Sequence, residues 1–135
     1  MKIMVAHDGS DNAQKALDKT LELFKPLNPE IILIMVVEGP RDASMENEPI
    51  FEREKSKCHD FLHKTAEKVV DQGFEVDAIL AVGDPRRMIT EATNTKSPDF
   101  LVVAKRGEGI VERMVLGSTS AFLIRHAKCP VLVVH

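Results

Sequence analysis

Glycine and hydroxyl residues gather in the last third of the chain at a spacing that suits phosphate binding. Gly107 and Gly117 stand with nine residues between them, and Ser118 follows the second glycine directly. Glycine lets backbone N–H groups approach an anion closely, and a helix beginning near Gly117 would add free amides and a positive dipole end. Arg106 could supply countercharge. The pattern indicates a phosphate cradle, but an ordinary turn followed by a helix cap would use the same residues.

The composition is that of one globular domain spanning residues 1–135. The chain is 44% hydrophobic and 29% charged, which is typical of a globular fold. Its net charge of −3 argues against a nucleic-acid partner, because nucleic acids are bound by strongly basic surfaces. The longest apolar run, Ile31 to Val37, is too short to cross a membrane. No secretory signal precedes the first strand, so we expect a cytoplasmic protein.

Short apolar stretches alternate with longer stretches whose apolar residues recur at helical spacing. The predicted strands are residues 2–7, 31–37, 74–82, 100–104 and 130–134, and the predicted helices are about 13–24, 50–72, 85–94 and 118–127. The polar segment from Glu38 to Pro49 reads as a long mobile loop. This alternation predicts an α/β fold: an open, mostly parallel five-stranded sheet with four helices distributed over both faces.

Polar residues follow the predicted strands at the point where each strand ends. Asp8-Gly9-Ser10 follows the first strand, Glu38 the second, Gly83-Asp84 the third and Lys105 to Gly109 the fourth. In a parallel sheet these segments share one rim, and ligands bind there where the strand order reverses. If the first and fourth strands are neighbours, Asp8 faces the loop that contains Gly107.

Several segments together resemble the universal stress protein family. The resemblance is carried by Ile3 to Ser10, by Gly83-Asp84-Pro85, by Gly107 to Ser118 and by Cys129 to Val134, in this order and spacing. It covers nearly the whole chain. It implies a Rossmann-like sheet of five strands and four helices, and a homodimer paired through the last strand, Val131 to Val134. Many members of this family bind ATP, whereas others do not.

The ATP-binding members share a motif of glycine, two residues, glycine, nine residues, glycine and a serine or threonine. Gly107, Gly117 and Ser118 match its second glycine, third glycine and hydroxyl, but Ala104 stands in place of the first glycine. If that position requires a positive φ, alanine costs about 1 kcal/mol, and its methyl group could crowd the nucleotide. If the position is the extended end of a strand, alanine is harmless.

The resemblance also implies a set of nucleotide contacts. Asp8 would accept hydrogen bonds from the ribose, and His7 lies beside it at the same rim; Asp8 could equally cap the first helix. Ala6 and Val36 would line the adenine side, although valines in such strands are usually core residues. Val103 and Ala104 would flank the nucleotide. The residues expected to hold the phosphates are Arg106, Gly107, Gly117, Ser118, Thr119 and Ser120.

The sequence offers little machinery for catalysis. A Walker loop is absent, and no carboxylate pair or nucleophile with a base can be identified. We therefore expect a protein that binds ATP or a related adenine nucleotide, with or without Mg²⁺ on the phosphates, as a ligand or switch in stress response with little or no hydrolysis. Two alternatives stay open: a member that works only through protein contacts, and a nucleotide-processing enzyme.

His59 and His63 stand four residues apart in a predicted helix, a spacing that can hold a metal ion. Cys58 is adjacent but points to a different side of that helix. Since the sequence places no third ligand of a suitable kind, it predicts no metal site.

Overall fold

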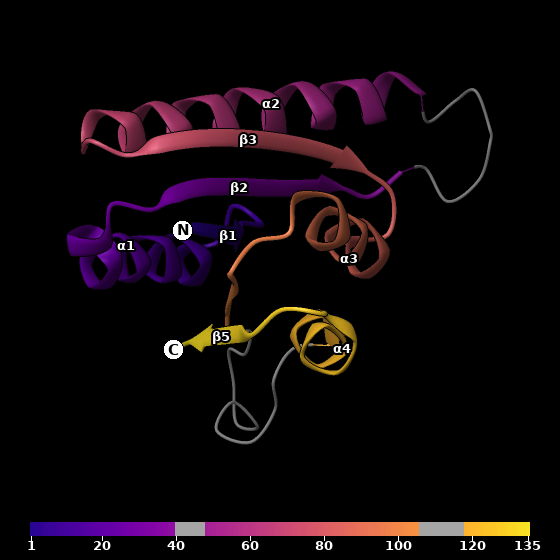
Figure 1. The fold of residues 1–135 in the computed structure, drawn as a ribbon. Coiled ribbons are helices and arrows are strands. Elements are labelled where there is room, and N and C mark those ends of the chain that lie inside the picture. The colour runs from indigo at the N-terminus through magenta and orange to yellow at the C-terminus, as the bar shows by residue number, and fades with distance from the viewer. Residues whose placement is uncertain (40–47, 106–117) are drawn as a thin grey trace.

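The computed structural model describes residues 1–39, 48–105 and 118–135. The described residues form a five-stranded sheet, in which all neighbouring strands are parallel, in the order β3-β2-β1-β4-β5. Figure 1 shows the strands with the four α-helices packed around them. The elements in chain order are β1 (Lys2–Ala6), α1 (Asp11–Phe24), a 3₁₀ turn (Lys25–Leu27), β2 (Glu30–Val37), α2 (Glu48–Asp71), β3 (Glu75–Val82), α3 (Pro85–Lys96), β4 (Phe100–Ala104), α4 (Ser118–His126) and β5 (Val131–Val134).

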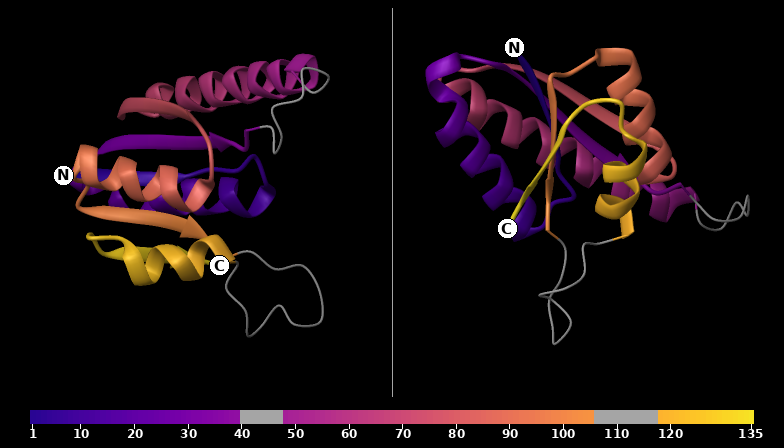
Figure 2. Two further views of the ribbon diagram at one scale, coloured as in Figure 1. Left: turned by 90° about the vertical axis from the view of Figure 1, so that its right-hand side faces the viewer. Right: turned by 60° about the horizontal axis from the view of Figure 1, so that its bottom comes forward.

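The sheet separates two apolar layers because successive side chains of a strand point to opposite faces. Ile3 and Val5 of β1 pack into a cluster with Leu17 of α1 and Val69 of α2. Met4 packs instead with residues of the opposite layer, which α3 and α4 cover. Figure 2 shows α3 and α4 lying side by side on their face of the sheet. Both faces of the central strands are therefore buried, which explains their continuous apolar sequences.

Local signals fix the ends of the helices. Ser10 caps α1, and its Oγ accepts a hydrogen bond from the Ala13 N–H at 3.1 Å. Gly73 follows α2 with φ of +96°, a conformation that favours glycine. Pro85 opens α3, where a missing N–H costs nothing. None of the helices in the described residues is long and apolar enough to cross a membrane.

The predicted fold class is confirmed, with one change at the second helix. The described element bounds lie within two residues of the predicted ones. Pro49 was expected in the loop, but α2 begins at Glu48, so this proline lies in the first helical turn. Proline is tolerated there because the first amides of a helix have no partner within it. The remainder of the predicted mobile loop, residues 40–47, lies outside the described residues.

Two leucines on α1 test this packing. Leu17 is 1% exposed and Leu23 is 55% exposed, so the same substitution on the same helix should have different effects. We expect Leu17→Ala to lower the free energy of unfolding by about 2–5 kcal/mol, because it leaves a cavity in the core. Leu23→Ala should change it by no more than about 0.5 kcal/mol. Urea unfolding measures both values, and equal losses would contradict the orientation of α1.

Candidate functional site

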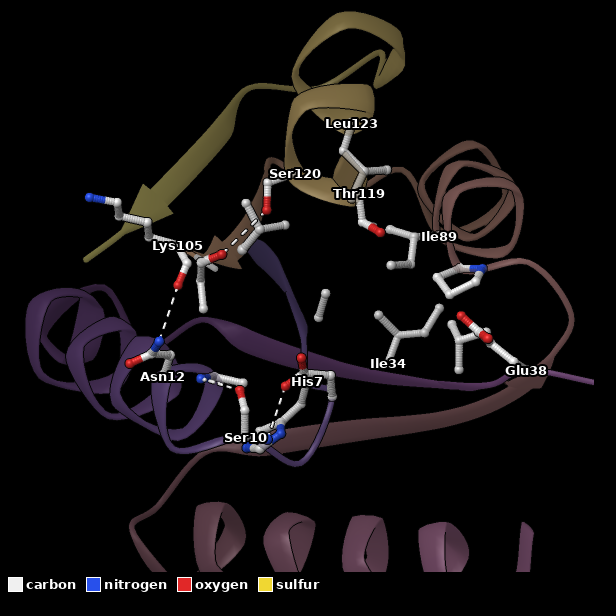
Figure 3. A pocket seen from close by; sticks show the side chains of 17 residues that line it. His7, Ser10, Asn12, Ile34, Glu38, Ile89, Lys105, Thr119, Ser120 and Leu123 are labelled. Atoms are coloured by element: carbon white, nitrogen blue, oxygen red, sulfur yellow. Dashed lines mark hydrogen bonds between the residues drawn. The ribbon is translucent and has the colours of Figure 1, made fainter. Parts of the chain in front are cut away.

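A cavity of about 620 Å³ opens at the carboxyl ends of the central strands (Figure 3). It lies beside the pairing of β1 with β4, from which the strand order runs outward in both directions. This is the place where open α/β sheets bind ligands. The carboxyl-terminal halves of the central strands, the residues that follow them and the first two turns of α1, α3 and α4 supply the lining residues: Ala6, His7, Asp8, Ser10, Asn12, Ala13, Ile34, Val36, Glu38, Pro85, Ile89, Val103, Ala104, Lys105, Thr119, Ser120 and Leu123.

The cavity combines an apolar wall with polar side chains. In Figure 3, Ile34, Ile89 and Leu123 lie along one side, together with the polar Thr119 and Glu38, whereas Ser10 and Asn12 lie across the cavity at the start of α1. The apolar side chains also belong to the core layer under α3 and α4, so this wall is held in place by the fold itself. Such a cavity suits a ligand with a flat apolar part joined to a polar part.

Asp8 stands in the turn between β1 and α1. The backbone N–H of His7 still bonds the Ile34 carbonyl at 2.9 Å, and the chain then leaves the sheet. The Ser10 N–H donates to Asp8 Oδ1 at 2.9 Å, and Gly9 has φ of +84°. The helix cap is Ser10 rather than Asp8. The carboxylate of Asp8 is therefore held at the cavity by a turn, and the alternative that Asp8 caps α1 does not apply.

His7 lines the cavity, but both of its ring nitrogens contact the protein. The side chain is 3% exposed, and the Gly9 N–H donates to Nδ1 at 3.0 Å. Since Nδ1 accepts, the neutral ring carries its hydrogen on Nε2, which lies 3.0 Å from Gln14 Oε1. The ring also makes an edge contact with Phe61 at 5.2 Å. His7 is thus a satisfied structural residue in the wall of the cavity.

Ala104 occupies the last position of β4 and pairs with Val134. Among the described non-glycine residues, φ is positive at Asn28 and Ser97 alone, so Ala104 carries no left-handed strain. The Ser120 hydroxyl donates to the Ala104 carbonyl at 3.3 Å and is 6% exposed. The position is therefore the extended end of a strand, tied to the first turn of α4, and alanine is compatible with its backbone.

The structure brings eight of the predicted site residues together around the cavity: Ala6, His7, Asp8, Val36, Val103, Ala104, Thr119 and Ser120. Ser118 begins α4 and is exposed, and it is not part of the described lining. Arg106, Gly107 and Gly117 lie outside the described residues. The phosphate cradle as a whole therefore stays a prediction, whereas its two flanks lie at the cavity.

Sequence reasoning missed several lining residues. Asn12 is the clearest case, because its Nδ2 donates to the Lys105 carbonyl at 3.3 Å and joins the start of α1 to the end of β4. No local pattern signals a contact between residues so far apart in the chain. Ile34 could have been found, since it stands two residues before Val36 and so shares a face of β2 with it.

Outside the cavity, the described histidine pair and Cys129 are poorly placed for metal binding or nucleophilic chemistry. The rings of His59 and His63 are parallel with centroids 6.4 Å apart, and His63 Nε2 contacts Glu67 Oε1 at 3.0 Å. Within the described ranges, no group of three or more His, Cys, Asp or Glu side chains is placed to hold a metal ion. Burial raises the pKa of the Cys129 thiol, which disfavours its reactive thiolate form.

Comparison with known sequences gives a consistent result. The family model described as "Universal stress protein family" matches residues 1–135. The chain is 30% identical over 139 residues to universal stress protein MJ0531 of Methanocaldococcus jannaschii. This alignment covers 98% of this chain and 81% of that protein. A relative from Bacillus subtilis, universal stress protein YxiE, is 29% identical over 147 residues, covering 98% and 97% of the two chains.

Solved structures agree in fold. UspA from Lactobacillus plantarum superposes with a TM-score of 0.86 over 100% of this chain and 97% of its own, at 20% identity. A family protein from Arabidopsis thaliana with AMP bound gives 0.78 at 29% identity, covering 99% and 90%. A universal stress protein in complex with cAMP gives 0.72 at 26% identity, covering 100% and 96%. From the family match over its whole length and this shared fold, the chain belongs to the universal stress protein family.

Proposed function

We propose that this chain is a cytoplasmic protein that binds ATP or a related adenine nucleotide in the cavity beside β1 and β4. The observation that carries the proposal is the pairing of an apolar wall with the Asp8 carboxylate in one cavity at the switch point of the sheet. Solved family members hold AMP and cAMP, which share adenine and ribose with ATP. The bound nucleotide acts as a ligand or switch.

Different lining residues of the cavity suit different parts of the nucleotide. Adenine fits against the apolar side chains of Ala6, Ile34 and Val36, which line the cavity from β1 and β2. Asp8 can accept hydrogen bonds from the ribose hydroxyls, because an ionised carboxylate is a strong acceptor. The phosphates would extend toward the start of α4, where free amides and the helix dipole favour negative charge.

The same contacts support binding with little or no hydrolysis. A general base must be free to take a proton from water, but both ring nitrogens of His7 are engaged by Gly9 and Gln14. The Ser120 hydroxyl donates to the Ala104 carbonyl. We therefore propose that nucleotide release or exchange, rather than turnover, ends the bound state. Mg²⁺, if it takes part, would bind on the phosphates.

Two aspartates near the start of α1 offer a matched test. Asp8 lines the cavity, whereas Asp11 lies in the first turn of α1 outside the described lining. Asp8→Ala should weaken ATP binding at least about tenfold, because hydrogen bonds to a charged group contribute about 1.5–3 kcal/mol. Asp11→Ala removes the same charge and should leave affinity within about twofold. Calorimetric titration of nucleotide-stripped protein, with and without Mg²⁺, measures both.

The same titration separates the alternatives. If the parent protein fails to bind ATP, AMP and cAMP, and none of them raises its melting temperature, the proposal is wrong and the family member acts through protein contacts. A ligand that binds only the native state must raise that temperature. Phosphate release well above a slow background, abolished in Asp8→Ala, would instead favour a nucleotide-processing enzyme.

Ala104 gives a second prediction, because its backbone is extended and paired with β5. Restoring the motif glycine with Ala104→Gly should leave ATP affinity within about threefold. It should lower the free energy of unfolding by about 0.5–1 kcal/mol, since glycine loses more backbone entropy in a strand. Titration and urea unfolding measure the two effects. A gain in affinity of tenfold or more would show that the alanine methyl group crowds the nucleotide.

We also propose that two copies of the chain pair through β5. In the described sheet β5 pairs with β4 alone, so one of its edges is open. The Leu101 N–H bonds Pro130 O and the Lys105 N–H bonds Val134 O; by alternation, Val131 and Val133 turn their backbone groups toward the open edge. An apolar strand with an open edge invites pairing with another chain.

Val133→Pro tests the dimer without breaking the ladder to β4. Proline removes the outward N–H of this residue, and edge strands tolerate that loss. We expect light scattering to report a dimer for the parent and a monomer for the variant, with unchanged circular dichroism. A monomeric parent, or a folded variant that is still dimeric, would refute the interface.

A further inference from the structure

A chain of side-chain hydrogen bonds runs from the surface of α1 to the turn that carries Asp8. Gln14 Nε2 donates to Asp18 Oδ1 at 2.9 Å. Gln14 Oε1 lies 3.0 Å from His7 Nε2, and His7 Nδ1 accepts from the Gly9 N–H at 3.0 Å. The chain therefore connects a helix position one turn into α1 with the backbone immediately after Asp8.

The direction of every bond in this chain is fixed by its two ends. A backbone N–H can only donate, so His7 Nδ1 must be without hydrogen and Nε2 must carry it. The carboxylate of Asp18 can only accept, so Gln14 must turn its amide nitrogen toward Asp18 and its oxygen toward His7. Gln14 is consequently the acceptor that holds the histidine in the form that receives the Gly9 N–H.

The surroundings leave the His7 ring little freedom. It is buried, and Phe61 from α2 meets its ring edge-on at an angle of 62°. Without an acceptor at Gln14, the Nε2–H group would be buried and unpaired, a costly state that the ring relieves by turning or by moving its hydrogen to Nδ1. Either change removes the acceptor for the Gly9 N–H.

The Gly9 bond matters because it fixes one side of Asp8. His7 holds the N–H of the residue after Asp8, and the Ser10 N–H holds the Asp8 carboxylate itself. Ser10 in turn caps α1 through Ala13. Two consecutive amides thus contribute to the placement of Asp8 at the cavity, and the first of them, at Gly9, is held by His7, whose ring Gln14 holds in turn.

We propose that Gln14, acting through His7, is a positioning residue for the ribose-binding carboxylate of Asp8. The inference rests on the proposed nucleotide function. His7 and Gln14 act by setting the turn so that Asp8 meets the sugar hydroxyls. Loss of Gln14 should therefore weaken binding only as far as the ribose hydroxyls contribute to it.

The experiment compares ATP with 2′,3′-dideoxy-ATP, which lacks both hydroxyls, by calorimetric titration. The parent should prefer ATP by at least about tenfold. Gln14→Leu should weaken ATP binding about tenfold, leave dideoxy-ATP within about twofold and so bring the preference close to one. Gln72→Leu is the matched control, because Gln72 is exposed just after α2, away from the cavity, and its side-chain amide donates to the Lys68 carbonyl at 3.4 Å. Asp18→Asn keeps an acceptor oxygen and should retain the preference.

A second variant removes the histidine from this series of hydrogen bonds. His7→Phe keeps a ring against Phe61 but removes both nitrogens, and should reduce the ATP preference as Gln14→Leu does. The double variant should lose no more than either single one, as expected for residues that act in series. Without nucleotide, hydrogen exchange at the Gly9 amide should be faster in Gln14→Leu than in Gln72→Leu.

Specific results would overturn the inference. If Gln14→Leu keeps the preference for ATP, weakens both nucleotides equally, or leaves exchange at Gly9 unchanged, Gln14 does not position Asp8. If the parent binds both nucleotides equally, Asp8 does not read the ribose. If the parent binds neither, the proposed function fails together with the inference, and the parent titration alone identifies that case.

Discussion

The parallel pairing of β1 with β4 is the constraint on which the rest of the structure depends. Ile3, Met4 and Val5 are fully buried, and they bond β2 on one side and β4 on the other. From this pair the sheet extends outward, to β2 and β3 on the β1 side and to β5 on the β4 side. The helices that follow β1 and β4 in the chain, α1 and α4, pack on opposite faces of the sheet, and the cavity opens where the strand order reverses between these two strands.

The cavity lining and the hydrophobic core share side chains in this arrangement. Ile34, Val103 and Leu123 line the cavity and also belong to the core layer beneath α3 and α4. A close-packed layer has few alternative arrangements, so the apolar wall is preformed. The polar side is different in kind, because Asp8, Ser10 and Asn12 stand on a turn and a helix start that are fixed by hydrogen bonds. The apolar wall is thus fixed by core packing, whereas the polar residues are fixed by hydrogen bonds.

The sequence predicted what depends on local pattern and failed where contacts join distant residues. Apolar runs and helical spacing predicted the five strands and four helices of the described residues. The shared rim of a parallel sheet predicted Asp8 at the ligand site and the family resemblance predicted Val36 there, and both line the cavity. The backbone at Ala104 could not be decided from its type, because a glycine motif does not state which φ it needs. The sequence around Asn12 and Gln14 does not indicate their hydrogen-bond partners, because those partners depend on how α1 packs against the sheet.

Two side-chain hydrogen bonds hold the described flanks of the predicted phosphate motif. Lys105 precedes residues 106–117 in the sequence, and its carbonyl accepts a hydrogen bond from Asn12. The helix α4 follows these residues, and its Ser120 donates a hydrogen bond to the Ala104 carbonyl. Both flanks therefore lie at the same rim as Asp8. A glycine motif between two free ends would have little meaning, because its amides could face any direction. Fixed ends beside the cavity are therefore what the phosphate prediction requires, and the structure supplies them at Lys105 and Ser120.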